Sequence, residues 1–267
     1  MTSRNLNIGP GGGWKRGGWL TVDYYHEADV VLDLRTSPQL PLPSHAFDKV
    51  FCSHVIEHLP DDAVRSLLCE IHRLLRYNGI VRLSCPDAAR AVADYRATGD
   101  CDPQNEIVSK SARHAPGHLR LLNIFASFQA PSYRGRTNSA NGYSGGPIVA
   151  KAKVDEKLSQ SSLTEFARWC RRLIPTEASY TAHINAFWAQ KLRRMLAEAG
   201  FVSIRRSEFQ KSADPELRSE GFDGRPHMSL FMEARARTRS KWLRWKWDRL
   251  CARVRALRPP AVRHPSS

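Results

Sequence analysis

The sequence lacks any long apolar run. Its first residues, MTSRNLNIGPGGG, contain no stretch of the about 7 to 15 apolar residues that form the core of a signal peptide. No segment reaches the roughly 18 apolar residues that a transmembrane helix needs. With 267 residues, the chain is long enough to bury a full core. We therefore expect a soluble, cytoplasmic protein.

Paired cysteines are also absent. The six cysteines are scattered along the chain, with no C-x-x-C pair and no regular spacing. In a chain without an export signal, such thiols are expected to stay reduced. The pattern argues against a disulfide scaffold and against a cysteine zinc site.

Two common nucleotide-binding motifs are missing. The apolar stretch NLNI leads into a glycine loop that begins at Gly9, but the third glycine of the dinucleotide fingerprint is replaced. Counted from Gly9 that place holds Trp14, and counted from Gly11 it holds Arg16. No G-x-x-x-x-G-K-[ST] occurs either. Neither an NAD-dependent dehydrogenase nor a P-loop nucleotide triphosphatase is supported.

The net positive charge is concentrated at the end of the chain. The net charge is +15, yet residues 235–267 hold eleven Lys/Arg and one acid. The first 234 residues therefore carry only +5. The composition indicates a basic appendage and gives little support to a basic globular surface.

Apolar runs and turn signals alternate along most of the chain, as they do in βαβ proteins. The predicted helices span residues 61–77 and 183–199, each with an apolar stripe and a helix stop signal, and regular structure is also expected at residues 163–173. This order predicts an α/β, Rossmann-like, mostly parallel sheet with helices on both faces and a shortened first crossover. The seven predicted strands are residues 5–8, 19–22, 29–34, 47–53, 80–85, 201–207 and 228–234.

Three regions are expected. Residues 1–234 form the main domain, residues 235–258 a basic amphipathic helix, and residues 259–267 a disordered tail. Within the main domain, residues 99–161 lose the regular pattern and become rich in Gly, Pro, Ser and Asn. A loop of this length is usually functional or disordered, so we interpret it as a substrate lid, with a mobile insertion as the alternative.

The glycine loop is followed by an acid at the end of each of the next two strands, Asp23 and Asp33. Glycine lets the backbone approach a ligand closely. Carboxylates at the ends of neighbouring strands line the crevice where open α/β sheets bind ligands. One acid can accept from ribose hydroxyls and the other from an adenine amino group. Together these features predict binding of a nucleoside-like cofactor.

The successive stretches LNIGPGGG, GWLTVD, VVLDL, FDKVFCSHVIEHL, EIHRLLRYNG and VRLSCPD resemble the motifs of class I S-adenosylmethionine-dependent methyltransferases. They are most similar to a compact bacterial subfamily, methyltransferase type 11-like, that is associated with polysaccharide biosynthesis. The resemblance implies S-adenosyl-L-methionine as cofactor, with Asp23 at the ribose. The residues it places around the cofactor are Asn7, Gly9, Gly11, Gly13, Asp23, Asp33, Leu34, Ser53 and His54.

Methyl transfer is an in-line displacement, and an alcohol acceptor also needs a base. His54 is the first candidate base because it follows the fourth strand, beside the cofactor methyl in this fold. Asp87 and His183 are further candidates. A non-catalytic module that binds S-adenosylmethionine is the alternative to an enzyme.

The stretch HVIEHLP fits H-x-x-E-H, a zinc peptidase motif. Two histidines that share zinc at this spacing must lie on a long helix, whereas this stretch follows a strand and meets Pro60. A zinc peptidase is therefore a remote alternative, and no metal site is expected. Glu57 and His58 are interpreted as bracing the turn.

In the basic tail, Leu243, Trp247, Leu250, Val254 and Leu257 recur at helical spacing among Lys and Arg residues. Such a helix suits the surface of an anionic membrane. Packing on the domain or on a partner, and binding to nucleic acid, are the alternatives. Membrane attachment would place the protein peripherally on the inner face of the plasma membrane and favour a lipid-linked glycan as acceptor. The acceptor atom and the oligomeric state are not predicted.

Overall fold

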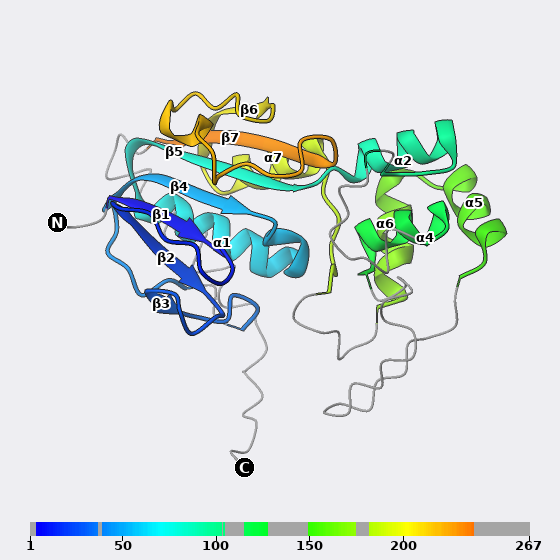
Figure 1. Ribbon diagram of the computed structural model, residues 1–267, viewed down its shortest axis with the longest axis horizontal. Helices are drawn as coiled ribbons and strands as arrows, with labels where there is room; N and C mark the ends of the chain where they lie inside the picture. Colours follow the sequence, from blue (N-terminus) through cyan, green and yellow to red (C-terminus); the bar gives the residue numbers. More distant parts are fainter. Residues whose placement is uncertain are drawn as a thin grey trace, which may run out of the picture.

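The computed structural model describes residues 4–36, 39–102, 104, 115–127, 149–174 and 182–237. Its centre is a seven-stranded sheet with the strand order β3-β2-β1-β4-β5-β7-β6 (Figure 1). The first five strands run parallel, and β7 runs antiparallel to both β5 and β6. The predicted mostly parallel Rossmann-like sheet is confirmed. The strands are β1 (Asn5–Ile8), β2 (Trp19–Asp23), β3 (Val30–Val31), β4 (Phe47–Ser53), β5 (Leu75–Pro86), β6 (Phe201–Ser207) and β7 (Ser229–Ala236).

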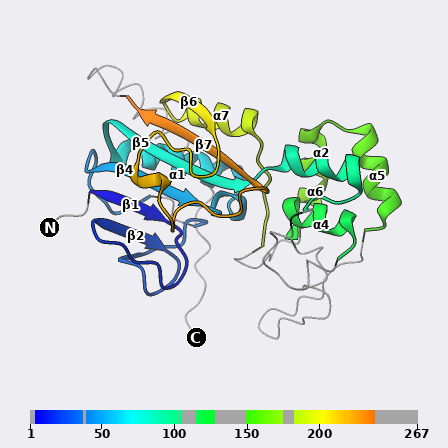
Figure 2. The same cartoon turned by 45° about the horizontal axis from the view of Figure 1, so that its top comes forward.

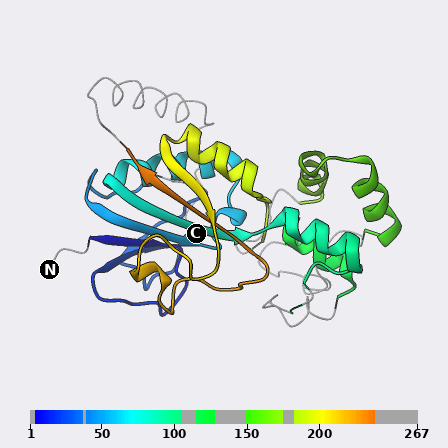
Figure 3. The same cartoon turned by 90° about the horizontal axis from the view of Figure 1, so that it is seen from above.

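The two helices that pack on the sheet, α1 (Asp61–Leu74) and α7 (Ala189–Glu198), lie together on one face (Figure 3). Within the described residues, the other face is covered by residues 208–228, including the short helix η4 (Glu216–Arg218). There Phe222 packs against Trp19 and Phe51. The second face therefore carries only this short helix among the described residues. The connections after β1, β2 and β3 carry no helix in their described residues, and the first crossover is short, as predicted.

Four further helices form a layer beyond the carboxyl ends of the central strands (Figures 1 and 2). They enclose a second apolar core that includes Tyr95, Phe125 and Phe166. Two of them fall inside residues 99–161, so the expected irregular structure is wrong for those segments, and the role as a substrate lid stays a prediction. The four helices are α2 (Ala88–Thr98), α4 (Gly117–Phe125), α5 (Lys151–Gln160) and α6 (Leu163–Arg172).

Several boundaries differ from the sequence prediction. The helix expected over residues 183–199 begins only at Ala189, because residues 183–188 are extended and Phe187 forms a bridge with Asp87. The helix expected over residues 61–77 ends at Leu74, since β5 already begins at Leu75 and pairs with Phe47 of β4. The strand expected over residues 29–34 is reduced to two residues.

The end of the chain is only partly described. β7 extends to Ala236, so the first two residues of the predicted tail helix belong to the sheet. Residues 238–267, which hold the rest of that helix and the predicted disordered tail, lie outside the described residues. Within the described part, no helix is both long and apolar enough to cross a membrane.

Candidate functional site

The order of the parallel strands reverses between β1 and β4, at the middle of the sheet. Open α/β sheets bind ligands outside the carboxyl ends of the strands at such a reversal. Ile8 at the end of β1 pairs with Val22 of β2 and with Cys52 of β4. The ends of these three strands are therefore level. The predicted cofactor residues at this edge are Asn7, Gly9, Gly11, Gly13, Asp23, Asp33, Leu34, Ser53 and His54.

The glycine loop begins where β1 ends, and its first residue must be glycine. Gly9 has a φ of 70°, a region that residues with a side chain rarely adopt. A Cβ at this position would lie 2.1 Å from Cγ2 of Val55, on the loop after β4. At Gly11 and Gly13 an added Cβ would meet no atom within 4 Å. The loop therefore has no room for a side chain at Gly9, whereas space is open beside Gly11 and Gly13.

Two carboxylates hold the amide groups of this loop. Asp23, the last residue of β2, accepts a hydrogen bond from the Gly11 amide over 2.8 Å and one from the Tyr25 amide over 3.2 Å. Glu27 accepts one from the Gly13 amide over 2.9 Å. Sequence reasoning missed Glu27, because no motif marks a side chain within the β2–β3 connection. Since its own acids occupy these amides, the loop offers little to a phosphate.

The same arrangement suits a cation. S-adenosylmethionine carries positive charge on its sulfonium and on its amino group, and acids and backbone carbonyls stabilise such charge. Asn7, just before the loop, is 2% exposed, and its Oδ1 has no hydrogen-bond partner in the described part of the chain. Buried acceptors are normally satisfied, so a donor from a ligand would complete this one. The residues present therefore fit the cofactor.

The remaining predicted cofactor residues lie farther along the edge. Oδ1 of Asp33 accepts from the Arg35 amide over 2.8 Å, and Leu34 beside it is buried. At the end of β4, the Ser53 hydroxyl lies 2.6 Å from that of Ser84. The fold brings all nine residues to one edge, and their individual roles stay predictions.

His54 follows β4 with a φ of 54°, and its ring is held by three side chains. Nδ1 lies 3.0 Å from Oε1 of Glu57, and Nε2 lies 2.9 Å from Oγ of Ser229. Nη1 of Arg225 lies 2.8 Å from the same Nδ1. An arginine only donates, so Nδ1 either donates to Glu57 or accepts from Arg225. The buried carboxylate needs a donor, which favours the first arrangement.

Asp87 is occupied by structural contacts. It is the N-cap of α2, where Oδ1 accepts from the Arg90 amide over 3.3 Å. Its Oδ2 lies 2.9 Å from Nη2 of Arg206. A carboxylate that caps a helix and pairs with a guanidinium is poorly placed to take a proton from an acceptor. Asp87 stays a candidate base by prediction only.

His183 lies beside the loop after β4, although more than a hundred residues separate it from His54 in the sequence. Its backbone is held by a residue that follows α4 in the helical layer. The Ser127 hydroxyl accepts from the His183 amide over 2.6 Å, and Nδ1 of the ring lies 2.8 Å from the Asn123 carbonyl. His58, in the short helix η1 (Ile56–His58), places its own Nδ1 3.1 Å from the Ala182 carbonyl. The two rings meet edge to face, with centroids 5.0 Å apart.

These two histidines and Glu57 form a cluster. One carboxylate oxygen of Glu57 and one ring nitrogen of each of His58 and His183 all lie within 4.8 Å of one another. Burial opposes ionisation of Glu57, but the hydrogen bond with His54 and the nearby histidines lower its pKa to about 2. Burial lowers the pKa of His183 to about 4. At neutral pH the cluster therefore holds a carboxylate beside a neutral imidazole.

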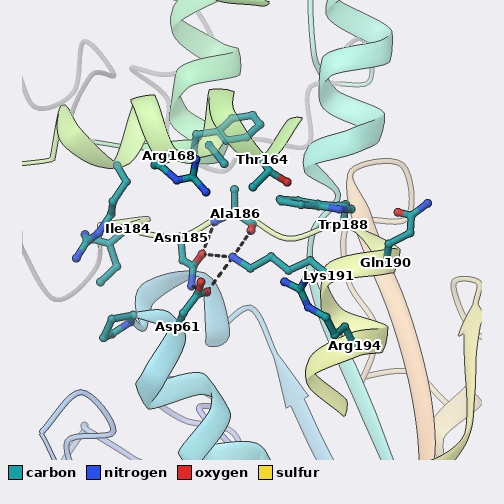
Figure 4. Close-up of a pocket in the computed structure, with 14 residues that line it drawn as sticks. Asp61, Thr164, Arg168, Ile184, Asn185, Ala186, Trp188, Gln190, Lys191 and Arg194 are labelled. Atoms are coloured by element: carbon teal, nitrogen blue, oxygen red, sulfur yellow. Dashed lines mark hydrogen bonds and ion pairs between the residues drawn. The ribbon is translucent and has the colours of Figure 1, made fainter. Parts of the chain in front are cut away.

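A separate pocket of about 470 Å³ lies between α7 and α6 (Figure 4). Arg168 enters it from α6, and Arg194 and Lys191 enter it from α7. Nζ of Lys191 lies 2.8 Å from Oδ1 of Asp61 and 2.6 Å from Oδ1 of Asn185. The pocket contains none of the predicted cofactor residues, and its cationic lining suits an anionic group.

Comparison with known proteins supports methyl transfer. A family model described as "Methyltransferase domain" matches residues 22–83, which span β2 to most of β5. No curated protein matches the chain. The matched segment, together with the strand order, supports a methyltransferase that uses S-adenosylmethionine as methyl donor.

Solved structures of S-adenosylmethionine-dependent methyltransferases are similar to this chain. One from Mesorhizobium loti is 18% identical, with a TM-score of 0.41, and the match covers 87% of this chain and 90% of that one. One from Archaeoglobus fulgidus is 14% identical, with a TM-score of 0.41 and coverages of 88% and 86%. These likenesses are weak, and the fold assignment rests on the strand order of this chain.

Proposed function

We propose that the protein transfers a methyl group from S-adenosylmethionine to a saccharide, or to another small or lipid-linked acceptor, in cell-surface glycan biosynthesis. The cofactor would lie along the glycine loop, with Asp23 at its ribose. The observation that supports the acceptor class is the basic pocket between α6 and α7. Nucleotide sugars and polyprenyl-linked saccharides both carry phosphate groups, which guanidinium groups bind well.

The residues that follow His183 connect the basic pocket to the loop after β4. Ile184 and Asn185 line the pocket and directly follow His183. Their amide groups donate to the Glu57 carbonyl over 2.9 and 3.1 Å. An acceptor that placed its phosphate near Arg168 would therefore have its sugar close to the histidines at the edge of the sheet. Holding the acceptor in line with the methyl group is the main demand of this reaction.

His54 is our proposed base for an alcohol acceptor. A hydrogen bond from Nδ1 to Glu57 fixes the tautomer in which Nε2 can accept a proton. In the structure, the Ser229 hydroxyl occupies that nitrogen over 2.9 Å. An acceptor hydroxyl would replace it and pass its proton to Nε2 as the methyl group is transferred. Asp87 and His183 remain the other candidates from the sequence.

The experiment is a screen for methyl transfer with radiolabelled S-adenosylmethionine. The acceptors are nucleotide sugars and polyprenyl-linked saccharides, and the competitors are free sugars, small acids and amines. Arg168→Ala should raise KM for a phosphate-bearing acceptor by about tenfold, since a charge-assisted hydrogen bond is lost. Arg90→Ala, on the exposed side of α2, is the matched control. Equal transfer to free sugars, with no effect of Arg168→Ala, would contradict this acceptor class.

Two alternatives predict different results. A non-catalytic module would bind S-adenosylmethionine and its demethylated product, yet would give no turnover with any acceptor. A zinc peptidase needs H-x-x-E-H on a long helix, whereas here the stretch forms a strand end and the three-residue helix η1. His54 is also absent from the cluster that brings His58 and Glu57 together. The peptidase is therefore not supported.

Peripheral membrane attachment through residues 235–258 is part of the same proposal. It is supported by the basic and aromatic sequence of that segment, which lies almost wholly outside the described residues. Co-sedimentation of the full chain with anionic liposomes should exceed that of a chain without residues 238–267. Equal sedimentation of both forms would remove the membrane role and leave partner or nucleic-acid binding.

A further inference from the structure

We propose that Glu57, His58 and His183 form a binding site for a first-row divalent transition metal, with Zn²⁺ as the expected ion. The three potential ligand atoms lie within 4.8 Å of one another. Ligands of four-coordinate zinc at about 2.1 Å lie roughly 3.4 Å apart. Small side-chain rotations would therefore be enough to close the site around an ion.

Both imidazoles are already oriented as metal ligands are. Nδ1 of His58 lies 3.1 Å from the Ala182 carbonyl, and Nδ1 of His183 lies 2.8 Å from the Asn123 carbonyl. A carbonyl only accepts, so each Nδ1 carries the proton and each Nε2 keeps its lone pair. Ligating histidines usually donate their other ring nitrogen to a carbonyl or carboxylate in this way. The tautomers needed for metal binding are thus set by the protein.

Glu57 provides a second, independent indication. Its side chain is 1% exposed, and Oε2 has no hydrogen-bond partner among the described residues. Oε1 is occupied by His54 over 3.0 Å. A buried carboxylate oxygen without a donor is costly, and a cation at Oε2 would remove that cost. His54 then acts as an outer-shell partner that orients the carboxylate.

The backbone holds the two ligand-bearing segments together. The amides of Ile184 and Asn185 donate to the Glu57 carbonyl, and the Asn185 side chain donates to the Leu59 carbonyl over 3.0 Å. Nε of Arg35 donates to the His58 carbonyl over 3.0 Å. These bonds keep His183 beside η1 despite the long separation in sequence. The geometry of the cluster therefore does not depend on the side chains alone.

The donor set selects the kind of metal. Two imidazoles and one carboxylate suit zinc and its first-row neighbours, whereas Mg²⁺ and Ca²⁺ prefer oxygen ligands. Three protein ligands leave at least one coordination position open for water or for an acceptor oxygen. If the proposed methyl transfer to an alcohol holds, the ion would polarise that oxygen beside His54. This catalytic role rests on the proposed function, while metal binding itself does not.

Metal binding can be measured on the purified full chain after dialysis against a chelator. Co²⁺ serves as a visible-absorbance probe, Zn²⁺ as its competitor, and Mg²⁺ as the comparison ion. We expect one equivalent of Co²⁺ to bind and to be displaced by Zn²⁺ and not by Mg²⁺. His183→Ala and Glu57→Gln should weaken binding more than about 100-fold, because even outer-shell changes cost about 10- to 100-fold. His26→Ala removes an exposed histidine elsewhere and should bind as the parent does.

The outcomes separate this proposal from the proposed function. Absence of stoichiometric Co²⁺ and Zn²⁺ binding to the unaltered chain would overturn the metal site, whatever the variants do. Equal loss of binding in His26→Ala would do the same, since it would indicate adventitious surface histidines. Binding of S-adenosylmethionine is measured in parallel on the metal-free chain. Its failure alongside intact metal binding would contradict methyl transfer and leave the metal site standing.

Discussion

Nδ1 of His54 lies 3.0 Å from Oε1 of Glu57, at the point where the strand order reverses. The contact joins the proposed base to the carboxylate of the proposed metal site. It also helps to explain why Glu57 remains ionised although it is buried: burial opposes the charge, but the bond from His54 and the nearby histidines together lower the pKa to about 2. The proposed catalytic base and the proposed metal site therefore share this hydrogen bond.

Asp23→Ala should weaken binding of S-adenosylmethionine at least about tenfold, through loss of a charged acceptor. It also frees the Gly11 amide that Asp23 now holds. Isothermal titration with S-adenosylmethionine and with its demethylated product measures the effect. Asp48→Ala, in the first half of β4, is the control and should leave the affinity unchanged. Unchanged affinity in Asp23→Ala would show that the cofactor does not bind at the end of β2.

Gly9→Ala should destabilise the fold more than Gly11→Ala. Both positions have positive φ, which costs a non-glycine residue about 1 kcal/mol. Only at Gly9 does the new Cβ meet Val55, at 2.1 Å, and such overpacking adds about 1 to 3 kcal/mol. Urea unfolding of the two variants gives the difference. Equal losses would mean that Val55 moves away freely.

Arg82→Met should lower the free energy of unfolding by about 3 to 5 kcal/mol, because it leaves buried carboxylates without a counter-charge. Nε of Arg82 lies 2.7 Å from Oδ1 of Asp223, and Nη1 lies 2.8 Å from Oε1 of Glu233. The Arg82 side chain is fully buried. Arg4→Met breaks the exposed pair with Asp48 and should cost at most about 1 kcal/mol. Similar losses for both arginines would contradict the importance of burial.

Stability should fall as the pH drops from about 6.5 towards 4, through His72. Burial lowers the pKa of this imidazole from 6.5 to about 4 in the folded chain. Above pH 6.5 the His72 imidazole is neutral in both the folded and the unfolded chain, so no stability is lost to its protonation. Below it the unfolded chain binds the proton first, so up to about 3 kcal/mol is lost by pH 4.

Chemical unfolding across this pH range measures the effect of His72. His72→Phe should make the profile less steep, because phenylalanine takes up no proton and can keep the ring contact with Phe201. Part of the slope should remain, because burial also lowers the pKa of His183 to about 4. His26→Phe is the control, since His26 is exposed and its loss should leave the slope unchanged. A profile as steep in His72→Phe as in the unaltered chain would show that His72 contributes nothing to the acid sensitivity.

Local sequence patterns were enough for the elements that line the cofactor edge. NLNI, WLTV and FDKVFCS formed strands where predicted, because apolar runs that end in glycine or acid leave few alternatives. The helix that begins at Asp61 was predicted from its apolar stripe, and only its end was misplaced. That error arose because pairing with β4 draws Leu75 into the sheet, and a helical pattern within one segment cannot reveal such a partner.

The helical layer was missed for a related reason. α4 and α5 are short, and polar residues surround them in sequence. Helices of this length gain most of their stability from packing, here against α2 and α6 around Phe125 and Phe166. Regular structure was predicted to return at Leu163, which is where α6 begins, and the structure shows a capping box of Ser162 and Glu165 at that point. Residues 117–125 and 151–160 are therefore helical because a tertiary core is available to them.

By itself the sequence determined the strand segments β1, β2 and β4, the short glycine loop and the acid that ends β2, because each depends on neighbours within a few residues. The tertiary structure alone decided that His183 lies against His58 and Glu57. That contact joins segments more than a hundred residues apart, through backbone bonds from Ile184 and Asn185 to η1. No local pattern encodes such a meeting, since it arises only when the extended segment before α7 packs beside the end of β4.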